Sequence, residues 1–139
     1  MRRGANAIEF ALTLPFVLLL LVGSTDFAWW SFSRQAVSRA VQDGAREASR
    51  TILPADAKTG APITDKAEMT TREALDLWGL DSSTATVTAT WTPDLSGRMW
   101  LRVHAAVPYQ SLFGLPFVGS QVSRTFVVYT QEQNNPVGP

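Results

Sequence analysis

The chain has 139 residues, the size of one small domain, and 45% of them are hydrophobic. Twelve basic and twelve acidic residues give a formal charge of zero, so no basic surface points to nucleic acid. The sequence has no cysteine and a single histidine, which excludes disulfides and leaves few ligands for a transition metal. We therefore expect neither a metal nor another cofactor.

The first predicted element is an apolar segment near the amino terminus. Phe10 to Thr25 contains no charged residue, and Arg2 and Arg3 precede it. A helix needs about 20 apolar residues to cross a bilayer, a length reached when the segment is extended to Phe32. Aromatic residues at that end suit the headgroup boundary, and the two arginines favour a cytoplasmic amino terminus. The rest of the chain would then lie outside the cytoplasm.

Three interpretations of this segment compete: a cleaved secretory signal, a plain signal anchor and a prepilin-type signal. Glu9 lies where the apolar region of a secretory signal should begin, and no clear small-residue cleavage site follows. A signal anchor accounts for the length of the segment but leaves Glu9 unexplained. A twin-arginine export signal fits less well, because Gly4 and Ala5 stand where polar and aromatic residues usually follow the arginines.

The stretch from Gly4 to Phe10, GANAIEF, resembles the class III signal of type IV pilins. The longer stretch GANAIEFALTLPFVLLLLVGSTDF resembles the start of TadE-like minor pilins of the Flp/Tad branch, including the Glu-Phe and Leu-Pro pairs. The resemblance implies that a prepilin peptidase cuts between Gly4 and Ala5 on the cytoplasmic side. Glu9 would then be the fifth residue of the mature chain, beside Phe10.

The chemistry of Glu9 fits the prepilin interpretation. Cleavage would create a free amine at Ala5, one helical turn before Glu9. A carboxylate in the first turn of a helix also meets the positive end of the helix dipole. By resemblance, Glu9 pairs with the new amine of a neighbouring subunit and sets the register of assembly. The alternative is a carboxylate that merely reaches the membrane surface.

A nearly continuous helix is predicted from Ala5 to Leu53, about 70 Å long. Pro15 lacks a backbone donor and crowds the preceding turn, so we expect a local kink or softening there. Gly23 and Gly44 would be further weak points. Beyond Phe32 the apolar residues recur near a four-residue spacing, as an amphipathic helix requires: Val37, Val41, Ala45, Ala48 and Ile52.

A loop from Pro54 to Thr64 and a short helix from Asp65 to Trp78 are predicted next. Asp65 and Glu68 match a capping box, and Gly79 can end the helix. The inner face of this helix would carry Ala67, Thr71, Ala74, Leu75 and Trp78. Alternating apolar and polar residues then predict three strands, over Thr84–Trp91, Arg98–Val107 and Gln121–Gln131, with a turn at Pro93–Gly97.

These elements predict an α+β fold with a long helix, a short helix and a three-stranded antiparallel sheet, the general shape of pilins. We expect the following parts: a leader (1–4), a transmembrane and assembly helix (5–32), an amphipathic extension (33–53), an extracytoplasmic α+β domain (54–130) and a polar tail (131–139). The run VHAAVPYQSLFGLPFVGSQVSRTFVVYTQE also resembles the end of TadE-like proteins. Strand alternation places Trp91 and Trp100 on opposite faces. Trp100 and Tyr129 would form an exposed aromatic patch for a partner, and the alternative is ordinary packing on the sheet.

No catalytic pattern stands out in the sequence. His104 is predicted on the outer face of a strand, and no nucleophile elbow, carboxylate pair or phosphate-binding glycine loop is present. We therefore predict a protein that is not an enzyme.

By resemblance, the chain would be a single-pass protein of the bacterial inner membrane with its domain outside, reaching the pilus or cell surface after assembly. Its partners would be the prepilin peptidase, other pilin subunits and, indirectly, an inner-membrane platform and an assembly ATPase. Its role would lie in pilus assembly, adhesion or secretion. The alternative is a membrane-anchored protein whose outer domain binds a partner without polymerising; an enzyme is the third class.

Overall fold

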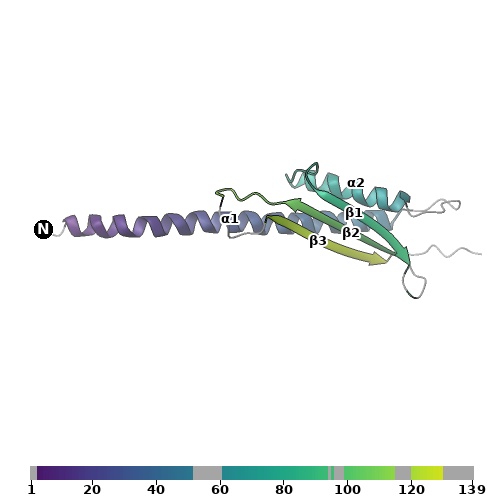
Figure 1. Ribbon diagram of the computed structural model, residues 1–139, viewed down its shortest axis with the longest axis horizontal. Coiled ribbons are helices and arrows are strands. Elements are labelled where there is room, and N and C mark those ends of the chain that lie inside the picture. Colours follow the sequence, from purple (N-terminus) through teal and green to yellow (C-terminus); the bar gives the residue numbers. More distant parts are fainter. Residues whose placement is uncertain (1–2, 52–60, 94, 96–98, 115–119, 130–139) are drawn as a thin grey trace, which may run out of the picture.

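The computed structural model describes residues 3–51, 61–93, 95, 99–114 and 120–129, with side chains of the first helix described from Ile8 onward. The elements in chain order are α1 (Arg3–Ser49), α2 (Ala61–Leu77), β1 (Thr86–Pro93), β2 (Met99–Pro108) and β3 (Gln121–Tyr129). In Figure 1, the first half of α1 projects alone, while α2 and the sheet gather around its second half. The predicted α+β fold is confirmed.

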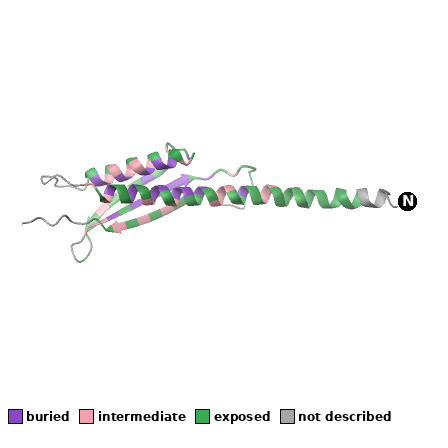
Figure 2. Cartoon of the chain, turned by 180° about the vertical axis from the view of Figure 1, so that it is seen from behind, coloured by how far each residue is buried: buried purple, intermediate pink, exposed green. Residues whose placement is uncertain are grey.

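The two halves of α1 have opposite surroundings. Every side chain from Ile8 to Leu21 is exposed (Figure 2). Beyond Ser33 one face is buried, and the predicted positions Val37, Val41, Ala45 and Ala48 lie on it, while the predicted Ile52 lies outside the described residues. The buried residues of that face are Ala36, Val37, Ala40, Val41, Gly44, Ala45 and Ala48. The predicted end at Leu53 was too late, because the helix ends at Ser49 and Thr51 already lies outside it.

Helix α2 begins four residues earlier than predicted, so Asp65 lies inside the helix and the capping box is wrong. Pro62 is accepted in the first turn because the N–H groups there have no partner within the helix. Glu68 has a different role from the predicted one. Its Oε1 accepts a hydrogen bond from the backbone N–H of Ala89 at 2.9 Å, which ties α2 to β1.

Gly79 ends α2 as predicted. Its φ of 72° lies in the left-handed region, where glycine has no steric penalty. The N–H of Leu80 donates to the carbonyl of Leu75 at 3.0 Å, and the N–H of Gly79 donates to that of Asp76 at 2.9 Å. This is the Schellman ending, and Leu75 and Leu80 are both buried beneath it. The predicted inner face is confirmed for Ala67, Thr71, Ala74 and Leu75, and Trp78 is half-buried.

The three strands form one antiparallel sheet in the order β1-β2-β3. Strand β1 begins at Thr86, two residues later than predicted. Val103 in the central strand lies opposite Ala89 and Phe126. Their side chains share the face that packs on the helices. The predicted alternation is confirmed, and the outer face carries Thr88, His104 and Thr125 in one row.

Both helices cover the same face of the sheet, and the core lies between the two layers (Figures 1 and 2). The two helices lie in close contact at Gly44. A Cβ built there would collide with Thr71 Oγ1 and lie 2.8 Å from the carbonyl oxygen of Ala67. Gly44, which the sequence suggested only as a weak point of the helix, therefore allows α1 and α2 to pack in contact.

Some predictions lie outside the described residues. They are the leader residues Met1 and Arg2, the part of the first loop up to residue 60, most of the turn at Pro93–Gly97, and the tail at 131–139.

Candidate membrane and assembly site

The exposed half of α1 is a long apolar surface. Its large side chains between Ile8 and Leu21 range from 40% exposed at Leu14 to 73% at Phe16. Soluble monomers rarely expose a contiguous apolar surface of this length, so it needs a covering environment. Among the described helices, α1 alone is long and apolar enough to cross a membrane.

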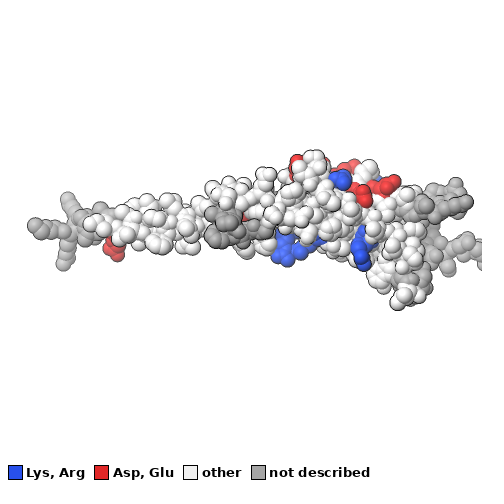
Figure 3. Space-filling view, in the orientation of Figure 1, with Lys and Arg blue, Asp and Glu red and all other residues white. Residues whose placement is uncertain are grey.

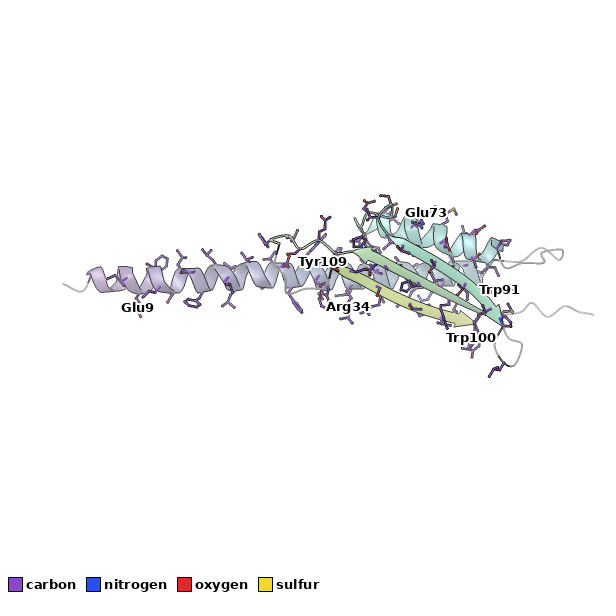
Figure 4. All side chains as sticks on the ribbon, in the orientation of Figure 1. Glu9, Arg34, Glu73, Trp91, Trp100 and Tyr109 are labelled. Atoms are coloured by element: carbon purple, nitrogen blue, oxygen red, sulfur yellow. The ribbon has the colours of Figure 1, made fainter. Side chains whose placement is uncertain are left out.

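Glu9 is the only charged residue between Ile8 and Thr25. It is exposed, and Figure 4 shows its side chain directed away from the helix. Figure 3 shows an isolated acidic spot on the otherwise white part of the projecting helix, where Glu9 is the charged residue of the sequence between Ile8 and Thr25. Phe10 beside it is also exposed. The pair is therefore presented outward, and the remainder of the domain lies further along α1.

The predicted cleavage position lies at the start of the same helix. Gly4 and Ala5 fall in the first turns of α1, which begins at Arg3. Ala5 precedes Glu9 by four residues, so both lie on one helical face. Cleavage between Gly4 and Ala5, and the pairing role of Glu9, stay predictions.

The hydroxyl groups in the apolar half donate to carbonyls of the helix itself. Thr13 Oγ1 lies 3.1 Å from the carbonyl oxygens of both Glu9 and Phe10. Thr25 Oγ1 donates to the carbonyl of Leu21 at 2.9 Å. Such bonds let hydroxyls lie in an apolar environment without water. The helix continues through Pro15, and the softening expected there stays a prediction.

A second site lies at Asp26, a residue of the TadE-like stretch for which the sequence predicted no partners. Asp26 is only 1% exposed although it directly follows the exposed apolar half of α1. Its Oδ2 accepts the hydroxyl of Ser111 at 2.8 Å, and its Oδ1 accepts the backbone N–H of Leu112 at 2.7 Å. The hydroxyl of Tyr109 donates to its backbone carbonyl at 3.1 Å. The connection between β2 and β3 is therefore fastened to α1 at this residue.

The fastening changes the electrostatics of Tyr109. Burial raises the pKa of its phenol, and the negative charge of the nearby Asp26 raises that pKa further. The Asp26 carboxylate is buried but has a donor on each oxygen, as buried charges require. The sequence signal was only a carboxylate directly after an apolar run. Its partners lie more than 80 residues further along the chain, so spacing could not identify them.

Aromatic side chains of α1 follow Asp26. The rings of Phe27 and Trp30 lie 5.7 Å apart, and those of Trp29 and Phe32 lie 5.5 Å apart. Arg34 lies over the ring of Trp30, with its guanidinium carbon 5.2 Å from the ring centre. Aromatic rings followed by a cation form the sequence of groups found at membrane surfaces.

Other polar groups of the domain are His104 and a carboxylate in a cleft. His104 Nδ1 lies 2.9 Å from Thr125 Oγ1, so the imidazole is engaged on the outer face of the sheet. A cleft of about 340 Å³ beside Tyr109 contains one carboxylate, Asp81, which accepts hydrogen bonds from Ser83. Within the described residues, no cluster of three or more His, Cys, Asp or Glu side chains could hold a metal.

The predicted aromatic pair on the outer face is present. The ring centres of Trp100 and Tyr129 are 3.5 Å apart, and the two residues lie opposite each other in the sheet. Trp91 lies on the other face, against the core, as the alternation predicted. Figure 4 shows Trp91 and Trp100 near the end of the domain remote from Glu9.

Comparison with known proteins supports the resemblance. A family model described as TadE-like protein matches residues 4–46. The match begins at Gly4 and includes Glu9, Phe10, Pro15 and Asp26, so the predicted TadE-like character of this segment is confirmed. No curated protein and no solved structure matches the chain. The match ends at Arg46, so the resemblance at the carboxyl-terminal end stays a prediction.

Proposed function

We propose that the chain is a minor pilin or pseudopilin of a Flp/Tad-type pilus system, processed by a prepilin peptidase and anchored by α1 in the bacterial inner membrane. The observation that carries this proposal is the exposed apolar half of α1 with one carboxylate at Glu9. The TadE-like match over residues 4–46 supports it. The chain serves as a structural subunit and a peptidase substrate rather than as an enzyme.

The exposed half of α1 suits two successive environments. Lipid covers it while the subunit waits in the membrane, with the amino terminus inside and the domain outside. Helices of other pilin subunits cover it after assembly, which the platform and the ATPase drive. Small and aliphatic side chains without intramolecular partners can pack in either environment.

Glu9 gives assembly its specificity. An ionised carboxylate at the bilayer centre costs about 2.5–3.5 kcal/mol on insertion scales, but near the membrane surface the cost is much smaller. Between packed helices the carboxylate needs a cationic partner, and the amine created at Ala5 supplies one from a neighbouring subunit. Because a buried charge is satisfied only at the matching offset, the pair fixes the axial register.

The charge of Glu9 can be tested by Glu9→Gln in a host that carries the pilus system. The variant keeps the shape of the side chain but leaves the partner's amine unpaired, which costs about 3–5 kcal/mol when buried. We expect normal membrane levels and normal processing, with incorporation into pilus fractions reduced more than ~100-fold. Quantitative immunoblots of membrane fractions measure the level and processing of the variant, and those of sheared pilus fractions measure its incorporation.

Thr13→Val is the matched control for Glu9→Gln. Thr13 lies one turn later on the same exposed segment, and its hydroxyl bonds only to carbonyls of its own helix. This variant should assemble like the parent. Normal incorporation of Glu9→Gln would contradict the pairing role, and equal loss in both variants would show that the assay reports helix damage.

The rival function is a membrane-anchored protein that binds a partner without polymerising. It requires the same anchor but no contact between pilin subunits. Crosslinking from position 16, the most exposed large side chain of the apolar half, separates the two. Crosslinks to other pilin subunits support the proposal, and crosslinks to lipid alone in a piliated host support the rival.

A further inference from the structure

The β2–β3 connection reaches further toward the exposed half of α1 than any other described part of the domain (Figures 1 and 2). Its ends are joined by a hydrogen bond from the N–H of Tyr109 to the carbonyl of Ser120, at 2.9 Å. Among its described residues, Leu112 and Phe113 are two neighbouring apolar residues, which we call the tip. They are 54% and 53% exposed, although both are large apolar side chains.

The tip is fixed against α1 at a defined level. The backbone N–H of Leu112 donates to Asp26 Oδ1, so the tip lies beside Asp26. Phe27, the next residue of α1, is also largely exposed, at 61%. Two chain segments that are far apart in the sequence therefore present exposed apolar side chains at one level along the rod.

That level coincides with the end of the membrane segment. Ile8 to Thr25 is eighteen residues of helix, which span about 27 Å. The hydrocarbon core of a bilayer is about 30 Å thick. Extending the span to Phe32, as the sequence suggested, would draw the irregular backbone around Leu112 into hydrocarbon. Lipid-exposed irregular backbone is not tolerated there because its polar groups would have no partners.

We propose that Leu112 and Phe113, together with Phe27, bind the lipid headgroup and upper acyl layer on the domain's side of the membrane. Asp26 is the positioning residue that holds this second membrane contact in place. Exposed α1 enters lipid at this level, so lipid also covers the tip. The rings of Trp29 and Trp30 and the guanidinium of Arg34 follow in order away from the bilayer, as polarity rises across an interface.

This contact would give the domain a fixed distance and tilt relative to the bilayer before assembly. A helix alone leaves the attached domain free to tilt relative to the bilayer. A second apolar contact on one side of the helix restricts that tilt. The proposal rests on the membrane span of the proposed function, and the experiment below separates the failure of each.

The test uses the absence of cysteine from the chain. Leu112→Cys and Leu95→Cys, each labelled with an environment-sensitive fluorophore, compare two exposed leucines at opposite ends of the domain. The full chain is reconstituted at low protein-to-lipid ratio into vesicles of phosphatidylethanolamine and phosphatidylglycerol. Quenching is measured with aqueous iodide and with lipids spin-labelled near the headgroup.

We expect the label at position 112 to show a several-fold lower iodide quenching constant than the label at 95, and strong quenching by the spin-labelled lipid. Equal iodide access at both positions in vesicle-bound protein would overturn the contact. Failure of the protein to float with vesicles in a density gradient would instead overturn the membrane span. Protection of position 112 that disappears on dilution of protein in lipid would assign the tip to a second copy and overturn the lipid contact.

Asp26→Ala tests the positioning role. Alanine has no side-chain acceptor, so the bonds from the Ser111 hydroxyl and from the Leu112 N–H are both lost. We expect the label at 112 to gain iodide access while the label at 95 is unchanged. If the label at 112 stays equally protected from iodide, in protein whose thermal unfolding remains cooperative, Asp26 does not position the tip.

Discussion

Two carboxylates on one helix illustrate how surroundings decide the role of a residue. Glu9 is exposed on an apolar surface and needs a partner from outside the chain once that surface is covered. Asp26, seventeen residues later, is buried and has both oxygens engaged by Ser111 and Leu112. The first therefore suits assembly between subunits, and the second suits attachment within one subunit.

Tyr109 makes the attachment at Asp26 sensitive to alkaline pH. Its pKa is raised in the folded state by burial and by Asp26. The unfolded chain therefore loses this proton first, at ~10. The stabilisation is fully present below that pH and is lost as the pH rises through the folded pKa. Tyr109→Phe should lower the free energy of unfolding by about 1 kcal/mol at neutral pH. The difference from the parent should narrow above pH ~10.

Denaturant unfolding at several pH values, followed by circular dichroism in detergent, measures that difference. The chain has two tyrosines, so Tyr129→Phe leaves Tyr109 as the only one for a titration of tyrosinate absorbance. A midpoint at or below that of free tyrosine would contradict the raised pKa.

Gly44 is the other residue whose role depends on a distant contact. Gly44→Ala should lower the free energy of unfolding of the domain by about 1–3 kcal/mol, because the added methyl group collides with Thr71 and the Ala67 carbonyl. Gly23→Ala is the control, since a Cβ there meets nothing within 4 Å. It should be neutral or stabilise the helix by up to ~1 kcal/mol. Thermal unfolding of both variants measures the two changes in stability. Equal changes would show that helix propensity, and not the collision at Gly44, determines the effect.

At the scale of elements, the ends of α2 are held by different means. Its start depends on Pro62 in the first turn and on the contact between Glu68 and β1. Its end depends on Gly79 and the two Schellman hydrogen bonds. The turn that follows leads into β1, which is an edge strand of the sheet. The ending of α2 therefore also positions that edge.

Gly79→Ala tests that ending. Alanine in the left-handed region costs about 1–2 kcal/mol, and we expect a loss of unfolding free energy of that size. Gly79→Asn should lose less, because asparagine adopts this conformation more readily. Chemical denaturation of the two variants provides the comparison. A Cβ built at Gly79 meets nothing within 4 Å, so equal losses would contradict the left-handed backbone conformation as the cause.

The elements with strong periodicity were predictable from the sequence. The buried face of α1 beyond Ser33 and the alternation in β2 follow directly from apolar spacing. The start of α2 was predicted too late because Asp65 and Glu68 match a local capping pattern. In the structure Glu68 instead makes a tertiary contact with Ala89. The contacts of Gly44 and Asp26 could not be predicted for the same reason. Their partners come from other elements, and local spacing contains no information about them.

At the scale of the molecule, the chain combines a rod and a domain with different requirements. The domain buries its own core between two helices and three strands. The rod from Ile8 to Leu21 buries nothing within the chain and must be covered from outside. The structure therefore separates stability, which the domain supplies, from assembly, which the rod is proposed to supply.

The most direct test of the account is the mass of the mature protein, purified from the membranes of its native host. Processing by the prepilin peptidase predicts a chain that lacks Met1 to Gly4 and begins at Ala5, and retention of the full chain in a host without the peptidase. Amino-terminal sequencing identifies the new end. A protein from the unmodified host that still carries Arg2 and Arg3 would contradict the proposed processing, and with it the amine that Glu9 is proposed to meet.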